Sequence, residues 1–372
     1  MAPEEIDSPF HAGERAVQQR VGVRERVERG GRRMIRDFMP EEHRVFFEQL
    51  PFLLVGSLDA EARPWASLLS GAPGFISAPT PNSLIVAAQP LPGDPLNTNL
   101  RAHAALGVLG IELPTRRRNR ANGHLRWVNE RAFELHVEQS FGNCKQYIQA
   151  RSPLETRLHD SRAPIIGNAL LSAPAAHLLR HCDTAFVASA SAHATAPPPA
   201  TNPAREHNPA REHNATHETN PAHEHNANHE TNPAHEHNAT RETNPAREGV
   251  DVSHRGGLPG FIRVQTVESG FTRLTLPDFY GNFMFNTLGN IEVNPRAGLL
   301  ACDFTTGDLL SLTGAARVIW DGPEVTAFQG AQRLLQIDVT SHLLFPAALE
   351  QTWSSPAFSP QLVETGTWSD RK

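Results

Sequence analysis

The 372-residue chain contains no apolar run of the roughly 18 residues that a membrane-spanning helix needs, and its N-terminus has no apolar signal segment. Its only cysteines are Cys144, Cys182 and Cys302, without a C-x-x-C pair, so neither a disulfide framework nor a thiolate zinc site is predicted. A net charge of −6 gives no reason to expect nucleic acid or a membrane surface as the main partner. We therefore expect a cytoplasmic protein.

Residues 1–50 carry a charged, helical pattern. Val17, Val21 and Val27 recur at helical spacing among many arginines. Gly30-Gly31 and Pro40 predict breaks that divide this N-terminal segment into about three helices. We interpret the arginine-rich face as a solvated helix surface, with an anion-binding face as the alternative.

From residue 51 to 141 the pattern changes to short β-strands. FLLVGSL, PWASLLS, SLIVAAQ and AALGVLGIEL are separated by turns rich in Gly, Pro and Asp, which favours a barrel or sandwich of antiparallel strands. Residues 142–181 predict a helix-rich connector. A second β-rich region spans 182–325, and residues 326–372 form a C-terminal extension without a clear period.

Residues 195–249 form a tandem array in which TNPAHEHNANHE is followed by TNPAHEHNATRE. The array has almost no apolar side chain larger than alanine, so it cannot offset the entropy cost of ordering, and a disordered insertion is predicted. Its histidines leave a weak transition-metal tract open as an alternative to a plain linker. We predict no metal site from it.

Without the array, the two β-rich regions match each other. Pro73-Gly74-Phe75 aligns with Pro259-Gly260-Phe261, and Gly71 with Gly257. The remaining anchors follow in the same order: Ser67 with Ser253, Asn97-Thr98 with Asn286-Thr287, and Asn122-Gly123 with Thr313-Gly314. We interpret this order as two copies of one small β-barrel, with the array inserted in a hairpin turn of copy two.

Several motifs together resemble the pyridoxamine 5′-phosphate oxidase-like FMN-binding split-barrel family, in particular a two-barrel subgroup of bacterial type. They are SPFHAGE, RPWASLL, QSFGNC, SHRGGLPGF and FNTLGNIEVNPRAGLL, and the resemblance covers about residues 8–323 without the array. It implies a mainly β fold with peripheral helices. Two split barrels would form a pseudo-dimer within one chain with FMN between them, while a homodimer of the whole chain stays open.

The resemblance also implies which residues would hold FMN. A phosphate needs cationic or N–H donors, and copy two offers Ser253 and Arg255 on a strand, Asp278 at a strand end, and Asn286 and Thr287 at a helix start. For Arg255 the alternative is an exposed arginine in a turn, and for Asn286-Thr287 it is an ordinary helix cap. No lysine or helix follows the glycines of SHRGGLPGF, so this stretch predicts a strand that ends in a corner.

Copy one offers Ser67, Asn97 and Thr98 at the matching positions. Its segment PTRRRNRANG adds arginines that alternate and therefore predict one strand face, namely Arg116, Arg118 and Arg120. That face either holds a phosphate from the neighbouring barrel or is an edge strand protected by charge.

The implied function is an FMN-dependent oxidoreductase that transfers hydride or electrons to a small molecule. No catalytic side chain is named, and NAD(P)H or a separate reductase is the expected reductant because the chain lacks a G-x-G-x-x-G dinucleotide motif. The C-terminus has no equivalent of the Trp/Arg/His segment of true pyridoxamine phosphate oxidases, so vitamin B6 is not expected as the substrate. The alternative is a non-enzymatic module that binds flavin or heme.

Overall fold

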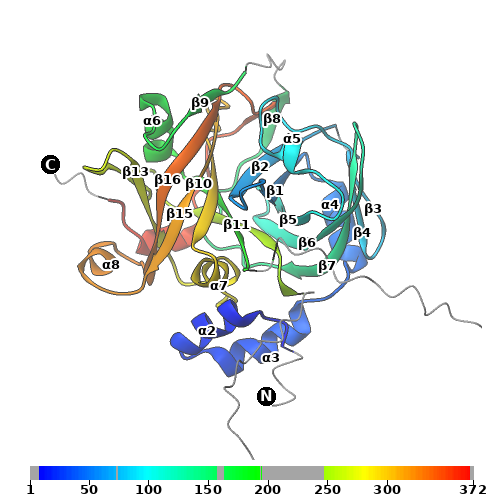
Figure 1. Cartoon of the computed structure of the whole chain (residues 1–372), viewed down its shortest axis with the longest axis horizontal. Helices are drawn as coiled ribbons and strands as arrows, with labels where there is room; N and C mark the ends of the chain where they lie inside the picture. Colours follow the sequence, from blue (N-terminus) through cyan, green and yellow to red (C-terminus); the bar gives the residue numbers. More distant parts are fainter. Residues whose placement is uncertain (1–7, 73, 157–162, 193, 195–246, 369–372) are drawn as a thin grey trace, which may run out of the picture.

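The computed structural model describes residues 8–72, 74–156, 163–192, 194 and 247–368. The predicted insertion at 195–249 and its histidine tract lie outside this part of the chain, apart from the last three residues. The fold is mainly β, with two large antiparallel sheets side by side and helices at the periphery (Figure 1).

The first sheet has seven strands in the order β2-β1-β5-β6-β7-β4-β3. Its strands are β1 (Phe52–Leu58), β2 (Pro64–Ser70), β3 (Ile76–Thr80), β4 (Ser83–Val86), β5 (Ala105–Glu112), β6 (Arg117–Val128) and β7 (Phe133–Gly142), and α5 (Leu96–Asn99) lies between β4 and β5. These elements span residues 52–142.

The second sheet has eight strands, seven of them in the order β11-β10-β14-β15-β16-β13-β12, with β9 paired to β16. Its strands are β9 (Ile165–Gly167), β10 (Thr184–Ala190), β11 (Val250–Gly256), β12 (Arg263–Thr266), β13 (Thr272–Asp278), β14 (Arg296–Cys302), β15 (Leu309–Ile319) and β16 (Arg333–Phe345). Between β13 and β14 lies α7 (Asn286–Val293), and between β15 and β16 lies α8 (Pro323–Ala327).

The two sheets repeat one strand order, and the aligned residues occupy equivalent places in them. Ser67 pairs with Val55 across β1 and β2, and Ser253 pairs with Val187 across β10 and β11. Each sheet also has a β-bulge at the aligned Asn122-Gly123 and Thr313-Gly314. A bulge needs a specific local backbone, so its recurrence at an aligned position is what a duplicated unit produces.

Two expected boundaries are corrected by the strand assignments. The second sheet does not end at residue 325, because β16 runs through the segment expected as a C-terminal extension and pairs with both β15 and β13. Most side chains of β16 are buried on both faces of the sheet, so buried and exposed residues do not alternate along it. This explains why its sequence shows no two-residue period. The C-terminal part also contributes β17 (Gln351–Trp353) and a 3₁₀ helix at Pro360–Glu364.

The expected helix-rich connector at 142–181 is also corrected. Its described residues contain one helix, α6 (Ala173–His181), preceded by β8 (Pro153–Thr156) and β9. Ile166 and its neighbours form an edge strand on β16 instead of a helix. The short β8 pairs with β17.

The N-terminal segment forms three helices, α2 (Ala12–Arg20), α3 (Arg24–Met34) and α4 (Glu41–Glu48). The first break lies at Gly22, whose φ of +73° suits glycine, and not at Gly30-Gly31 inside α3. Gly31 is there for packing, because a Cβ at this position would lie 2.5 Å from the Phe10 ring. Helix α2 packs on α7, below the sheets in Figure 1.

Each sheet has its own apolar core, and a third core joins the two sheets. This shared core contains Leu54 and Trp65 from the first sheet and Phe186, Val252 and Leu300 from the second. Burial of a side chain of this kind contributes about 1.5–3 kcal/mol, so this core stabilises the packing of the two sheets on each other. Among the described helices, none has the length and apolar character needed to cross a bilayer.

Candidate functional site

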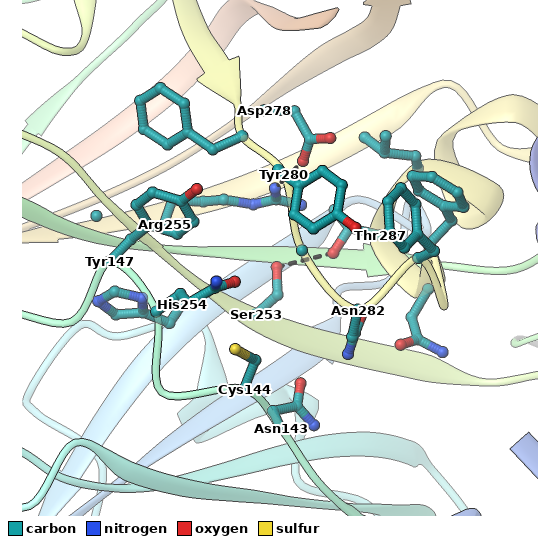
Figure 2. A pocket seen from close by; sticks show the side chains of 18 of the residues that line it. Asn143, Cys144, Tyr147, Ser253, His254, Arg255, Asp278, Tyr280, Asn282 and Thr287 are labelled. Atoms are coloured by element: carbon teal, nitrogen blue, oxygen red, sulfur yellow. Dashed lines mark hydrogen bonds and ion pairs between the residues drawn. The ribbon is translucent and has the colours of Figure 1, made fainter. Parts of the chain in front are cut away.

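A pocket lies at the junction of the two sheets and encloses about 860 Å³, including the part open to solvent (Figure 2). It is lined by β6 and the segment after β7 from the first half of the chain. The second half contributes β11, the end of β13, the following loop and the start of α7. Neither half of the chain can form it alone.

Four arginines line this pocket, namely Arg118, Arg120, Arg255 and Arg333. Arg120 forms a buried ion pair with Asp251 at 2.8 Å. Asp278 accepts from Arg255 and lies 3.4 Å from Arg333. Four guanidinium groups are therefore matched by two carboxylates.

Arg118 differs from the other three because no carboxylate in the described part of the chain pairs with it. Its Nε donates to the carbonyl oxygen of Cys144 at 2.8 Å. Burial, followed by repulsion from Arg120, lowers the pKa of Arg118 to about 9. The group stays charged at neutral pH, so an anion that entered the pocket would find an unbalanced positive charge.

Several buried donors in the pocket lack partners among the described residues. His254 is only 6% exposed and neither ring nitrogen has a hydrogen bond, and the Nε atoms of Arg120 and Arg255 are also unsatisfied. Burial, reinforced by Arg118 and Arg255, lowers the pKa of His254 well below its usual value. His254 is therefore neutral and offers one donor and one acceptor. Unsatisfied buried polar groups are costly, which indicates a ligand or water here.

The N-terminus of α7 opens into the same pocket. Its N-cap residue, Phe285, has φ +62° and gives no side-chain cap. Thr287 in the first turn lies 2.7 Å from Ser253, hydroxyl to hydroxyl. First-turn N–H groups and two hydroxyls at the positive end of a helix dipole are typical of a phosphate site.

Aromatic side chains form another part of the lining. The chain has two tyrosines, Tyr147 and Tyr280, and both are in the pocket. Tyr147 stacks on Phe279 with 4.9 Å between ring centroids, and Tyr280 meets Phe283 edge-on at 4.7 Å. Tyr147, Phe283 and Phe285 all have φ between +60° and +63°, a strained conformation that concentrates at ligand sites.

The structure brings seven of the predicted site residues together, and these are Arg118, Arg120, Ser253, Arg255, Asp278, Asn286 and Thr287. Asn286 accepts from Arg120 at 3.0 Å and donates to the buried Glu14 of α2. This network connects the pocket to the N-terminal helices.

Four predicted site residues do not line this pocket. Arg116 lies in the turn before β6 with φ +58°, so it does not share the strand face of Arg118 and Arg120. Its side chain donates to the backbone carbonyl of Ile148. Asn97 and Thr98 bond to backbone carbonyls of their own turn. Ser67 donates to the buried Asp94 at 2.6 Å.

The equivalent place in the other half of the junction has no arginine at the positions aligned with Arg118, Arg120 and Arg255. Strand register makes Leu69 the counterpart of Arg255, Leu309 of Arg118, and Ser311 of Arg120. Leu309 belongs to the shared apolar core, whereas Leu69 belongs to the core of the first sheet. The chain therefore has one charged pocket at its junction and one apolar counterpart.

Sequence reasoning missed Arg333, His254 and Tyr147 as pocket residues. Arg333 fell in the segment expected as an extension, and only the pairing of β16 with β13 brings it beside Asp278. His254 lies within SHRGGLPGF, between the predicted site residues Ser253 and Arg255, so its place next to them could have been predicted from the sequence. Tyr147 reaches the pocket through a left-handed turn that its sequence does not predict.

The residues present fit a phosphorylated aromatic ligand such as FMN. Arginines outnumber the carboxylates that pair with them, and Arg118 has no carboxylate partner among the described residues, so the pocket favours an anion such as a phosphate monoester. Unsatisfied donors and aromatic rings are available for a ring system. Comparison with family models and with curated proteins finds no match to this chain.

Proposed function

We propose that this pocket binds FMN and that the chain is an FMN-dependent oxidoreductase of the split-barrel, pyridoxamine 5′-phosphate oxidase-like type. The single observation that supports this best is Arg118, a half-buried cation without a carboxylate partner among the described residues, next to Arg120 and Arg255. A dianionic phosphate would compensate it, and the motif resemblance selects FMN among phosphorylated aromatic ligands.

In this proposal the chain binds and orients the cofactor. Arg118, Arg255 and the first turn of α7 would hold the phosphate, with Ser253 and Thr287 as hydroxyl partners. His254 would supply one hydrogen bond at a fixed place, and the aromatic lining would exclude water. The bound flavin supplies the hydride or electron transfer, and a reduced nicotinamide or a separate reductase supplies the electrons.

The test is a titration of the purified full chain with FMN, followed by flavin fluorescence. Arg118→Gln removes the unpaired cation and should weaken binding by about tenfold or more, since a charge-assisted hydrogen bond contributes about 1.5–3 kcal/mol. Riboflavin, which lacks the phosphate, should also bind more weakly than FMN.

Arg117→Gln is the matched control. Arg117 is adjacent in the sequence, but its side chain donates to the backbone carbonyl of Glu42 and lies over the Phe46 ring, and it does not line the pocket. Unchanged FMN binding in Arg118→Gln, or no FMN uptake by the native chain, would contradict the proposal. Bleaching of bound flavin by NADPH would support an oxidoreductase, whereas bound flavin that no reductant reduces would favour a binding module.

A further inference from the structure

Cys144 is a thiol in the wall of the arginine-rich pocket, beside Asn143 (Figure 2). It is partly accessible, whereas Cys182 is 5% exposed and Cys302 is 2% exposed. Burial also raises the pKa of both buried thiols, that of Cys302 to about 12. Because the thiolate is the reactive form, the two buried cysteines are unreactive and serve as internal references.

The backbone around Cys144 is fixed against Arg118. The amide of Asn143 donates to the Arg118 carbonyl at 3.1 Å, and Arg118 Nε donates to the Cys144 carbonyl at 2.8 Å. The pKa of Arg118 is lowered mainly by burial, and the Cys144 side chain acts in the opposite direction and raises it. Thiol and guanidinium are therefore close enough to interact electrostatically.

A thiol alone would not make a site, but the same pocket contains buried polar groups that lack partners. His254 is 6% exposed with both ring nitrogens unbonded among described residues, and Arg120 is 7% exposed with a free Nε. These groups point to a polar ligand beside the thiol. The surrounding arginines select for negative charge in that ligand.

We propose that Cys144 is a thiolation site that takes a carboxylate-bearing, low-molecular-weight disulfide such as glutathione disulfide, and that this modification closes the pocket to its phosphate ligand. The closing of the pocket to a phosphate ligand rests on the proposed function, whereas the thiolation of Cys144 does not. The attached tripeptide would place its carboxylates near Arg118 and Arg120, where the phosphate would otherwise bind.

The step is a thiol–disulfide exchange. The Cys144 thiol loses its proton to solvent, and the thiolate attacks one sulfur of glutathione disulfide. A bond forms between Cys144 Sγ and that sulfur as the original disulfide bond breaks. The second glutathione leaves as a thiolate and takes up a proton, so Cys144 is oxidised and one glutathione is reduced.

The test compares glutathione disulfide, which is anionic, with cystamine, a cationic disulfide. Rates on the full chain are followed by mass spectrometry with peptide mapping and are divided by the rates of the same reagents on free N-acetylcysteine. We expect the normalised rate to favour glutathione disulfide by about tenfold at low salt, and this preference to shrink at high salt. Arg118→Gln should reduce the preference, and Arg117→Gln should retain it.

Cys144→Ser should abolish the adduct, and dithiothreitol should release it. Equal normalised rates for the two reagents, or adducts on Cys182 or Cys302 instead, would overturn the assignment. When FMN is bound first, the exchange should slow by about tenfold at saturation. Bound FMN that does not slow the exchange would refute the closing of the pocket, whereas failure of FMN to bind together with selective thiolation would refute only the proposed cofactor.

Discussion

Arg120 in the first sheet and Asp251 in the second sheet form a buried ion pair, with 2.8 Å between Nη1 and Oδ1. Both side chains are less than a tenth exposed. The pair lies beside the pocket and bonds the two halves of the chain across their junction. Burial lowers the pKa of Arg120 and repulsion from Arg255 lowers it further, whereas Asp251 acts in the opposite direction and favours the charged guanidinium.

Replacing Asp251 by Asn is expected to destabilise the chain by about 3–5 kcal/mol, because the change leaves Arg120 buried without its counter-ion. Urea unfolding monitored by tryptophan fluorescence measures this. Arg126→Gln is the control, since Arg126 pairs with Glu134 and is 49% exposed, and its loss should cost about 0–1 kcal/mol. Equal effects of the two changes would show that the buried pair has no special role.

The chain should bind one FMN and not two. The apolar counterpart of the pocket has Leu69 where the pocket has Arg255, and Ser67 is occupied by Asp94. Isothermal titration calorimetry on the full chain gives the stoichiometry. Arg255→Leu, which gives the pocket the residue of its counterpart, should weaken binding by about tenfold or more. A value of two sites per chain would contradict this prediction.

Gly256→Ala should destabilise the fold and disturb the pocket. A Cβ at this position would lie 1.9 Å from the carbonyl oxygen of Tyr147, so the left-handed turn that places the Tyr147 ring must move. Overpacking of this kind costs about 1–3 kcal/mol, and FMN affinity should fall with it. Gly30→Ala in α3, where a Cβ meets nothing within 4 Å, should instead stabilise by about 0.5–1 kcal/mol. Thermal unfolding of both variants provides the measurement.

Asp94 should make the fold less stable as the pH rises. Burial raises its pKa from 3.8 to about 6, against the opposing hydrogen bonds from Ser67 and from the Leu96 amide. The stabilising contribution is complete below pH 3.8 and is lost as the pH rises through about 6. Asp94→Asn keeps an acceptor oxygen without the charge, so it should gain roughly 1–3 kcal/mol over the native chain at pH 8 and little at pH 4.

The control for this pH dependence is Asp59, whose pKa is lowered despite burial by hydrogen bonds from Trp65 and Arg63. Its contribution is present above its usual pKa and is lost as the pH falls. Asp59→Asn should therefore destabilise at pH 8, opposite in sign to Asp94→Asn. Urea unfolding at both pH values distinguishes the two, and the same sign for both would exclude a titration effect.

The mainly β fold with peripheral helices was predictable because it rests on local signals, whereas the arrangement of the strands as split barrels stays a prediction. Aligned turns and the corner at Gly71 and Gly257 indicated a repeated unit, and both glycines contact the aligned Phe75 and Phe261. Arg255, Thr287 and Arg118 were found because they lie on strands or helix starts whose side-chain direction follows from the period. Arg116 was misplaced because a left-handed turn interrupts that period.

Other features depend on contacts between distant segments and were not predictable. Arg333 enters the pocket only through the pairing of β16, a strand without alternation because it is covered on both faces. Gly31 lies inside α3, where the absence of a Cβ leaves room for the Phe10 ring, so this glycine marks a contact and not a helix break. A single sequence does not reveal such long-range packing.

The different chemistry at Arg255 and Leu69 has a consequence for how this chain can vary. In a symmetric homodimer every substitution changes both junction sites at once, so neither can be altered without altering the other. Here the two halves are encoded separately, and a change in one half leaves its counterpart intact. One place can thus keep its arginines while its counterpart uses leucines for packing, Leu69 in the core of the first sheet and Leu309 in the core that joins the two sheets.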